Sequence, residues 1–141
     1  MAKPEQVITV VREWLEKADN DLRNATHTLT LGAKGPTDTI CFHSQQCVEK
    51  YLKAFLVFAE IDFPKTHDLE ELISLMPEQY RPELSIQDQR RLTAYATVAR
   101  YPGGYPPIKL SEARQAVRLA RRIRKKIRGH LPKESLEQGR K

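Results

Sequence analysis

The architecture of this chain depends above all on one stretch, "CFHSQQCVEKYLKAFLVF", which runs from Cys41 to Phe58. Drawn as a helix at about 100° per residue, its apolar side chains cover well over half of the circumference. A helix that is apolar over so much of its surface is usually buried by more than one neighbour. We therefore expect a helix over about residues 38–60, buried in the core of a bundle and against a second subunit.

Polar side chains interrupt this apolar surface in a single sector, and they are His43, Gln46, Lys50 and Lys53. Two interpretations fit this polar stripe. It is the solvent face of the helix, with the lysine stems covering apolar surface. Alternatively it faces an anionic ligand, because two ammonium groups, an imidazole and an amide can hold phosphates. Geometry from the sequence alone does not choose between them.

Four further helices are predicted, at about residues 7–29, 69–76, 86–100 and 111–127. Apolar residues at helical spacing mark the first, and "GAKGPTD" ends it. Thr37 or Asp38 can cap the second helix, and Thr66 or Asp68 the third. Strand patterns are absent. The fold class is therefore all-α, an antiparallel up-and-down bundle of about five helices, with one domain over residues 1–131 and a flexible tail over 132–141.

The composition is that of a soluble globular domain, with 141 residues, 40% of them hydrophobic and 30% charged. Neither a membrane span nor a secretory signal is visible, so we expect a cytoplasmic protein. Cys41 and Cys47 would lie about 9 Å apart along one helix. That is too far for a disulfide, and we expect two buried thiols. Metal-ligand spacing is absent, so no metal and no cofactor is expected.

The net charge of +6 conceals an asymmetry along the chain. Residues 1–108 hold 12 Lys/Arg and 15 Asp/Glu, a balance of −3, whereas residues 109–141 hold 12 and 3, a balance of +9. The last helix is predicted to carry a row of cations opposite its alanine and isoleucine face, namely Arg114, Arg118, Arg121, Lys125 and Arg128. This row is either a solvated face or a surface for a polyanion or an acidic partner. Aromatic residues do not interleave with it, so RNA would be contacted at phosphates.

Three blocks of the sequence resemble the HEPN domain family. They are "FHSQQCVEKYLKAFL" (residues 42–56), "KTHDLEELI" (65–73) and "ARYPGGYP" (99–106), in that order. The resemblance covers about residues 7–130. It implies a helical bundle that forms homodimers and acts beside a nucleotidyltransferase-fold protein in a toxin–antitoxin-like pair. Within these blocks, His67, Arg100 and Tyr101 are candidate ligand residues. The structural alternatives are that His67 and Asp68 close the loop and cap the third helix, and that Arg100 pairs with Glu49 inside the bundle.

Some HEPN proteins are metal-independent RNases with the signature R-x(4–6)-H. In this chain no His follows Arg100 at that spacing, and Arg23 and His27 are one residue too close. Arg124 and His130 have the spacing, but they lie at a helix end beside Gly129. We therefore assign no catalytic residue. The expected function is a HEPN-type homodimeric module that binds nucleotide or RNA phosphate, and the alternatives are a metal-independent RNase and a purely structural interaction module.

Overall fold

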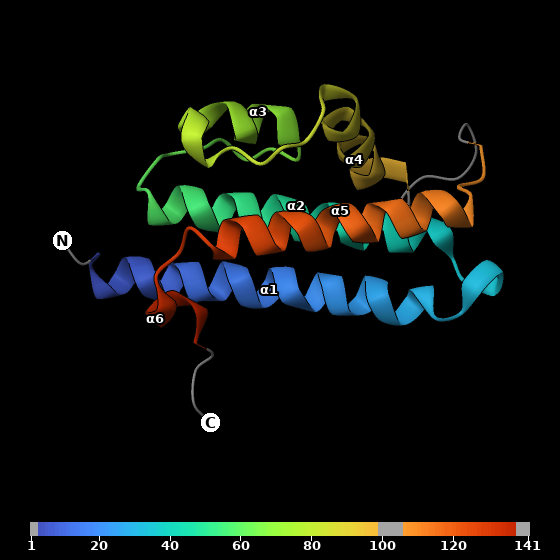
Figure 1. The fold of residues 1–141 in the computed structure, drawn as a ribbon, viewed down its shortest axis with the longest axis horizontal. Coiled ribbons are helices and arrows are strands. Elements are labelled where there is room, and N and C mark those ends of the chain that lie inside the picture. Colours follow the sequence, from blue (N-terminus) through green and yellow to red (C-terminus); the bar gives the residue numbers. More distant parts are fainter. Residues whose placement is uncertain (1–2, 99–105, 138–141) are drawn as a thin grey trace.

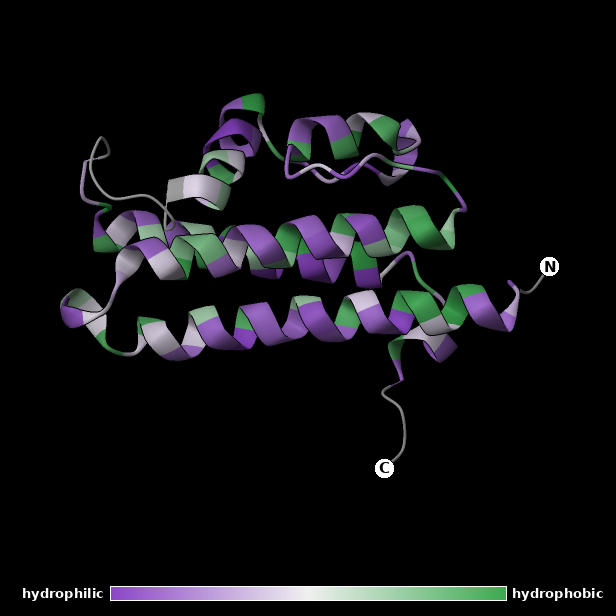
Figure 2. Ribbon diagram, turned by 180° about the vertical axis from the view of Figure 1, so that it is seen from behind, coloured by the Kyte–Doolittle hydropathy of each residue, from purple (hydrophilic) through white to green (hydrophobic). Residues whose placement is uncertain are grey.

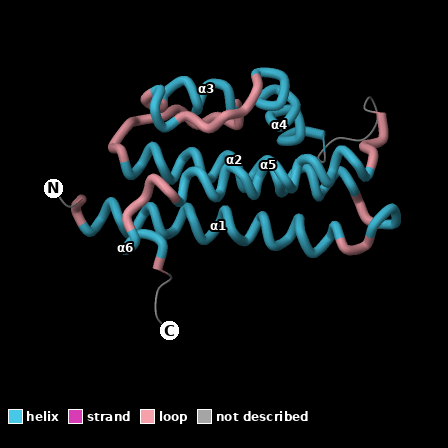
Figure 3. Tube along the Cα trace, in the orientation of Figure 1, coloured by secondary structure: helices cyan, strands magenta, loops and turns pink. Residues whose placement is uncertain are grey.

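The computed structural model describes residues 3–98 and 106–137, and within these ranges it contains helices, turns and loops but no strand (Figure 3). The helices are α1 (Glu5–Leu29), α2 (Thr37–Phe58), α3 (Leu69–Leu75), α4 (Ile86–Val98), α5 (Leu110–Arg128) and α6 (Lys133–Leu136), with 3-10 turns at Gly32–Lys34 and Glu78–Tyr80. The predicted all-α bundle is confirmed, and the short α6 is additional. In the described part of the chain, no helix is long and apolar enough to cross a membrane.

Helix α2 is the centre of the bundle. α1 and α5 run alongside it, and α3 and α4 cover its side away from α1 (Figure 1). Its apolar residues are consequently buried around most of the helix, including Ile40, Tyr51, Leu52 and Leu56, which have no exposed surface. The neighbouring helices of the same chain therefore account for the apolar circumference of α2. A second subunit is not required to cover this helix, and the homodimer stays a prediction that must rest on other grounds.

Helix α1 is amphipathic, as its spacing of apolar residues predicts. Its buried apolar residues are Ile8, Val11, Leu15, Ala18 and Ala25. Hydrophilic residues recur between them along the rest of the helix (Figure 2). After α1 the chain reverses through Gly32, whose φ of +62° is a left-handed conformation that glycine adopts without a steric penalty.

The helix caps agree with the sequence at α3 and differ at α2. The Asp68 carboxylate accepts hydrogen bonds from the backbone N–H groups of Glu70 and Glu71, as an N-cap residue should. Helix α2 instead begins directly at Thr37, after Pro36, and has no side-chain cap. The Thr37 hydroxyl is used elsewhere, because it donates to the carbonyl of Ile108 at 2.8 Å.

The C-terminal segment differs from the flexible tail that the sequence predicts from residue 132. Residues 133–136 form α6, which packs beside α1, and Ser135 is 1% exposed. The Arg12 guanidinium of α1 donates to the carbonyl of Glu134 at 2.6 and 2.9 Å. These contacts join residues far apart in sequence, which explains why a local pattern did not reveal them. Residues 138–141 of the predicted tail lie outside the described ranges.

Candidate functional site

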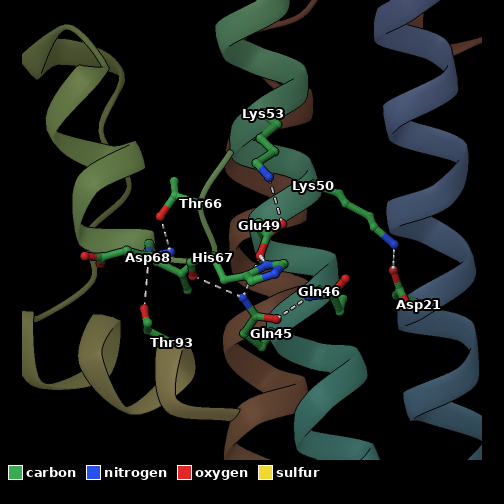
Figure 4. A network of polar contacts seen from close by, with 11 residues as sticks. Asp21, Gln45, Gln46, Glu49, Lys50, Lys53, Thr66, His67, Asp68 and Thr93 are labelled. Carbon is green, nitrogen blue, oxygen red and sulfur yellow. Dashed lines mark hydrogen bonds and ion pairs between the residues drawn. The ribbon is translucent and has the colours of Figure 1, made fainter. Parts of the chain in front are cut away.

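The polar stripe of α2 is organised by two carboxylates, each of which holds one lysine and one histidine. Asp21 of α1 accepts from Lys50 Nζ at 2.6 Å and lies 2.8 Å from His43 Nδ1. Glu49 of α2 accepts from Lys53 Nζ at 2.9 Å and lies 2.8 Å from His67 Nδ1 (Figure 4). The stripe thus faces α1 and the loop before α3.

Glu49 is the buried centre of the second group. Its carboxylate also accepts from Gln45 Nε2 at 2.9 Å. Burial raises the pKa of Glu49, but hydrogen bonds from Gln45, Lys53 and His67 outweigh burial and hold the pKa below its ordinary value. The carboxylate is therefore ionised at neutral pH, and it is satisfied by donors on both of its oxygens.

Lys53 is a structural partner of Glu49 rather than an exposed cation. Only 7% of the residue is exposed. Its ammonium lies 5.6 Å from the ring centroid of Trp14 and 5.8 Å from that of Phe63, both within the range of cation–π attraction. A lysine enclosed in this way joins α1, α2 and the loop that follows α2. Of the predicted ligand residues that the structure describes, Lys53 is the least accessible to a ligand.

His67 and Gln46 are the more accessible members of this group. The side chain of His67 is 53% exposed, although its Nδ1 is held by Glu49. Gln46 donates through Nε2 to Gln45 Oε1 at 2.7 Å, and Gln45 in turn donates to Glu49 (Figure 4). The carboxylate therefore orients the imidazole and leaves Nε2 directed away from this bond. Such an imidazole can contact an anion.

Two predicted ligand residues, Arg100 and Tyr101, lie outside the described residues. The predicted ion pair of Arg100 with Glu49 therefore stays a prediction. Glu49 already has Gln45, Lys53 and His67 as partners within the described chain.

Helix α5 separates its apolar and basic faces as the sequence predicts. Its alanine and isoleucine face is buried against the bundle, at Ala113, Ala116, Ala120, Ile123 and Ile127. The opposite face exposes Arg114, Arg118, Arg121 and Lys125, and within the described residues none of these four forms an ion pair. We call these four residues the α5 cation row. The fifth predicted member, Arg128, is only partly exposed and lies 3.7 Å from Asp19 Oδ2.

Sequence reasoning did not identify the cluster around Asp19, which joins α1, α2 and α5. The Asp19 carboxylate accepts from the Tyr51 hydroxyl and from Arg124 Nε, the latter at 2.9 Å. Burial and the neighbouring carboxylate raise the pKa of Tyr51, so its hydroxyl stays protonated. The only local signal was an acid directly after Ala18 in the buried stripe of α1.

Arg124 and His130 are not brought together despite their matching spacing. Arg124 is bound to Asp19 on the α1 side of α5. The His130 ring instead packs against Tyr80 and Phe55, with centroid separations of 5.0 and 6.3 Å. Its Nε2 is buried without a hydrogen-bond partner in the described structure. The two side chains thus do not form a shared acid–base site within this chain.

Comparison with known proteins identifies the family to which this architecture corresponds. The HEPN domain matches residues 11–130. TT1696 from Thermus thermophilus is 28% identical, with a TM-score of 0.70, over 86% of this chain and 98% of that one. ST0689, an archaeal HEPN homologue, is 27% identical, with a TM-score of 0.64, over 85% of this chain and 96% of that one. No curated protein is significantly similar.

Proposed function

This chain belongs to the HEPN domain family, and we propose that it is a binding module for the phosphate groups of RNA or a nucleotide. The observation that carries the proposal is the α5 cation row, which is exposed and lacks acidic partners among the described residues. Phosphate contacts from Lys and Arg supply most of the sequence-independent affinity of proteins for nucleic acid. A row of four such cations along one helix suits the backbone of a nucleic acid.

The arrangement of charge on α5 is unfavourable without a ligand. Like charges four residues apart occur at Arg114–Arg118 and at Arg121–Lys125. Each such pair destabilises a helix by about 0.2–0.5 kcal/mol. A solvated helix face usually mixes the two signs of charge and avoids this cost. An anionic ligand would offset the repulsion, which supports a binding role over a merely solvated face.

The proposal includes a homodimer and a nucleotidyltransferase-fold partner, in a toxin–antitoxin-like pair. Both rest on the family, whose domains are commonly dimeric, and not on the apolar surface of α2. One chain has a mass of 16.3 kDa, and light scattering at micromolar concentration should give twice this mass. A monomer mass across the same range would remove the homodimer from the proposal.

The alternative of a metal-independent RNase finds less support in the geometry. Such a reaction needs a general acid or base close to a group that stabilises charge. Arg124 and His130 have different partners, Asp19 and the Tyr80–Phe55 pair. Any RNA cleavage by the protein should therefore persist in His130→Ala. Cleavage that disappears in this variant while the fold is retained would contradict this expectation.

The test of the binding proposal is a titration of labelled single-stranded RNA at two salt concentrations. Affinity should fall with salt, with a log–log slope of about −0.7 for each neutralised phosphate. The double variant Arg118→Gln/Arg121→Gln should weaken binding to all sequences alike and flatten the slope, because phosphate contacts do not specify bases. The matched control is Arg90→Gln/Arg91→Gln, which removes equal charge from α4. Absence of RNA binding at low salt would reject RNA as the ligand and leave a nucleotide, an acidic protein partner or a structural module.

A further inference from the structure

The groove between α1 and α5 has two halves of unlike charge, which meet at Asp19 and Arg124. Toward α6, a hollow of about 320 Å³ is lined by Arg12 and Arg128 but also by three more acids, Glu13, Glu16 and Glu137. Away from α6, a shallow hollow of about 510 Å³ is lined by Arg23 and His27 of α1 together with Asp19 and Arg124. We call the second hollow the open half-groove. Among the described residues that line the open half-groove, Asp19 is the one acid, beside Arg23 and Arg124, so the net charge of this half is positive.

Arg124 is held at the edge of the open half-groove in a defined orientation. Its hydrogen bond to Asp19 uses Nε, at 2.9 Å, so this carboxylate does not consume the terminal amino groups. Asp19 is fixed in turn by the hydroxyl of Tyr51, a residue with no exposed surface. The Arg124 side chain is nevertheless 39% exposed. A guanidinium fixed on one side and open on the other is suited to the fork-like contact with phosphate.

The α5 cation row lies on the same helix as Arg124, with three of its members before Arg124 in the sequence and the fourth directly after it. Because α1 and α5 run antiparallel, residues that precede Arg124 on α5 lie along the part of α1 that follows Asp19 (Figure 1). That part of α1, residues 22–30, contains Arg23 and His27 and no acid. From Leu22 to Thr30 the helix rises about 12 Å, at about 1.5 Å per residue. Beyond Asp19, both helices that border the groove are therefore free of acids over a length that exceeds one phosphate group.

We propose that single-stranded RNA lies in the open half-groove, with one phosphate held by Arg124 and contacted by Arg23 and His27 from α1, and that the strand continues along the α5 cation row. This assignment rests on the proposed function and adds the path that the RNA strand takes across the protein surface. The acids near α6 disfavour a path in the opposite direction. The strand thus contacts two helices rather than the outer face of α5 alone.

The experiment uses fluorescence anisotropy with a labelled oligouridylate and the full-length chain. The variant Arg23→Gln/His27→Gln should bind about tenfold more weakly, as expected for the loss of a charge-assisted contact. Both residues are exposed, and the one hydrogen bond of the Arg23 side chain in the described structure is to Asn20, so the fold should be unaffected. Arg124→Lys keeps the positive charge but loses the two parallel N–H donors of the guanidinium, so it should weaken RNA binding to a similar degree. Arg90→Gln on α4 is the control, with affinity unchanged.

The outcomes separate this inference from the proposed function. If wild-type protein binds no RNA at low salt, the groove assignment and the RNA part of the proposed function both fail. If Arg118→Gln/Arg121→Gln weakens binding while Arg23→Gln/His27→Gln does not, the proposed function survives and the groove assignment is overturned. If unlabelled ATP competes at concentrations equal to those of the RNA, the site is one for a mononucleotide, and the strand assignment is overturned as well.

Discussion

Replacement of Glu49 should destabilise the protein strongly, because it leaves the Lys53 ammonium buried without its carboxylate. The two groups are 2.9 Å apart, and their side chains are 4% and 9% exposed. Breaking a buried pair by removing one partner costs about 3–5 kcal/mol. A domain of this length has a total stability of about 7–15 kcal/mol. Glu49→Leu should therefore remove a fifth or more of the free energy of unfolding, while the two aromatic rings around Lys53 compensate only in part.

The partner substitution should be milder, and the double substitution should restore much of the loss. Lys53→Met leaves Glu49 with donors from Gln45 and His67, so the carboxylate stays satisfied. In Glu49→Leu/Lys53→Met both charges are gone, and apolar residues of similar volume often replace a buried pair at little cost. Of the two single variants, Glu49→Leu should therefore be the less stable, and the double variant should be more stable than Glu49→Leu.

Urea unfolding followed by circular dichroism measures these differences, with the m-value checking two-state behaviour. The pH dependence gives a second readout. Because the pKa of Glu49 is lowered in the folded state, its contribution is present above its ordinary value of 4.5 and is lost as the pH falls below it. Glu49→Leu should lack this part of the acid dependence. A double variant whose loss equals the sum of the single losses would refute the reasoning, because it would show no coupling between the two charges.

Three further outcomes are expected. Burial raises the pKa of the Cys41 thiol to about 12 and also raises that of Cys47, so both should react with a thiol reagent only after denaturation, and rapid labelling of the native protein would contradict this. Burial and Lys126 lower the pKa of His130, so stability should fall as the pH drops below 6.5, and His130→Phe, measured by thermal unfolding at several pH values, should reduce this dependence. Leu52→Ala should cost about 2–5 kcal/mol in urea unfolding, because Leu52 has no exposed surface, and a loss below about 1 kcal/mol would mean that the core collapses around it.

The sequence was enough to predict which polar side chains lie together on α2, but not which groups surround them in the folded chain. The spacing of His43, Lys50 and Lys53 placed them in one sector of α2, and all three are held by carboxylates. Whether that sector met solvent or protein depended on where α1 and the loop before α3 lie. Two acids enclose this sector in protein. Asp21 of α1 pairs with His43 and Lys50 across the two helices, and Glu49 pairs with Lys53 along α2 and with His67 from the loop before α3. No single-helix pattern indicates which of the available acids a cation will meet.

The sequence by itself determined the five longer helices, the all-α class and the two faces of α5, because helical periodicity is a local property of the chain. The tertiary structure alone decided that α2 is enclosed by its own chain, that Asp19 gathers Tyr51 and Arg124, and that α6 is tied to Arg12. Arg124 is separated from Asp19 by 105 positions and Glu134 from Arg12 by 122. Such contacts arise only when helices pack at a particular rotation, and that rotation follows from the fit of all the core side chains together.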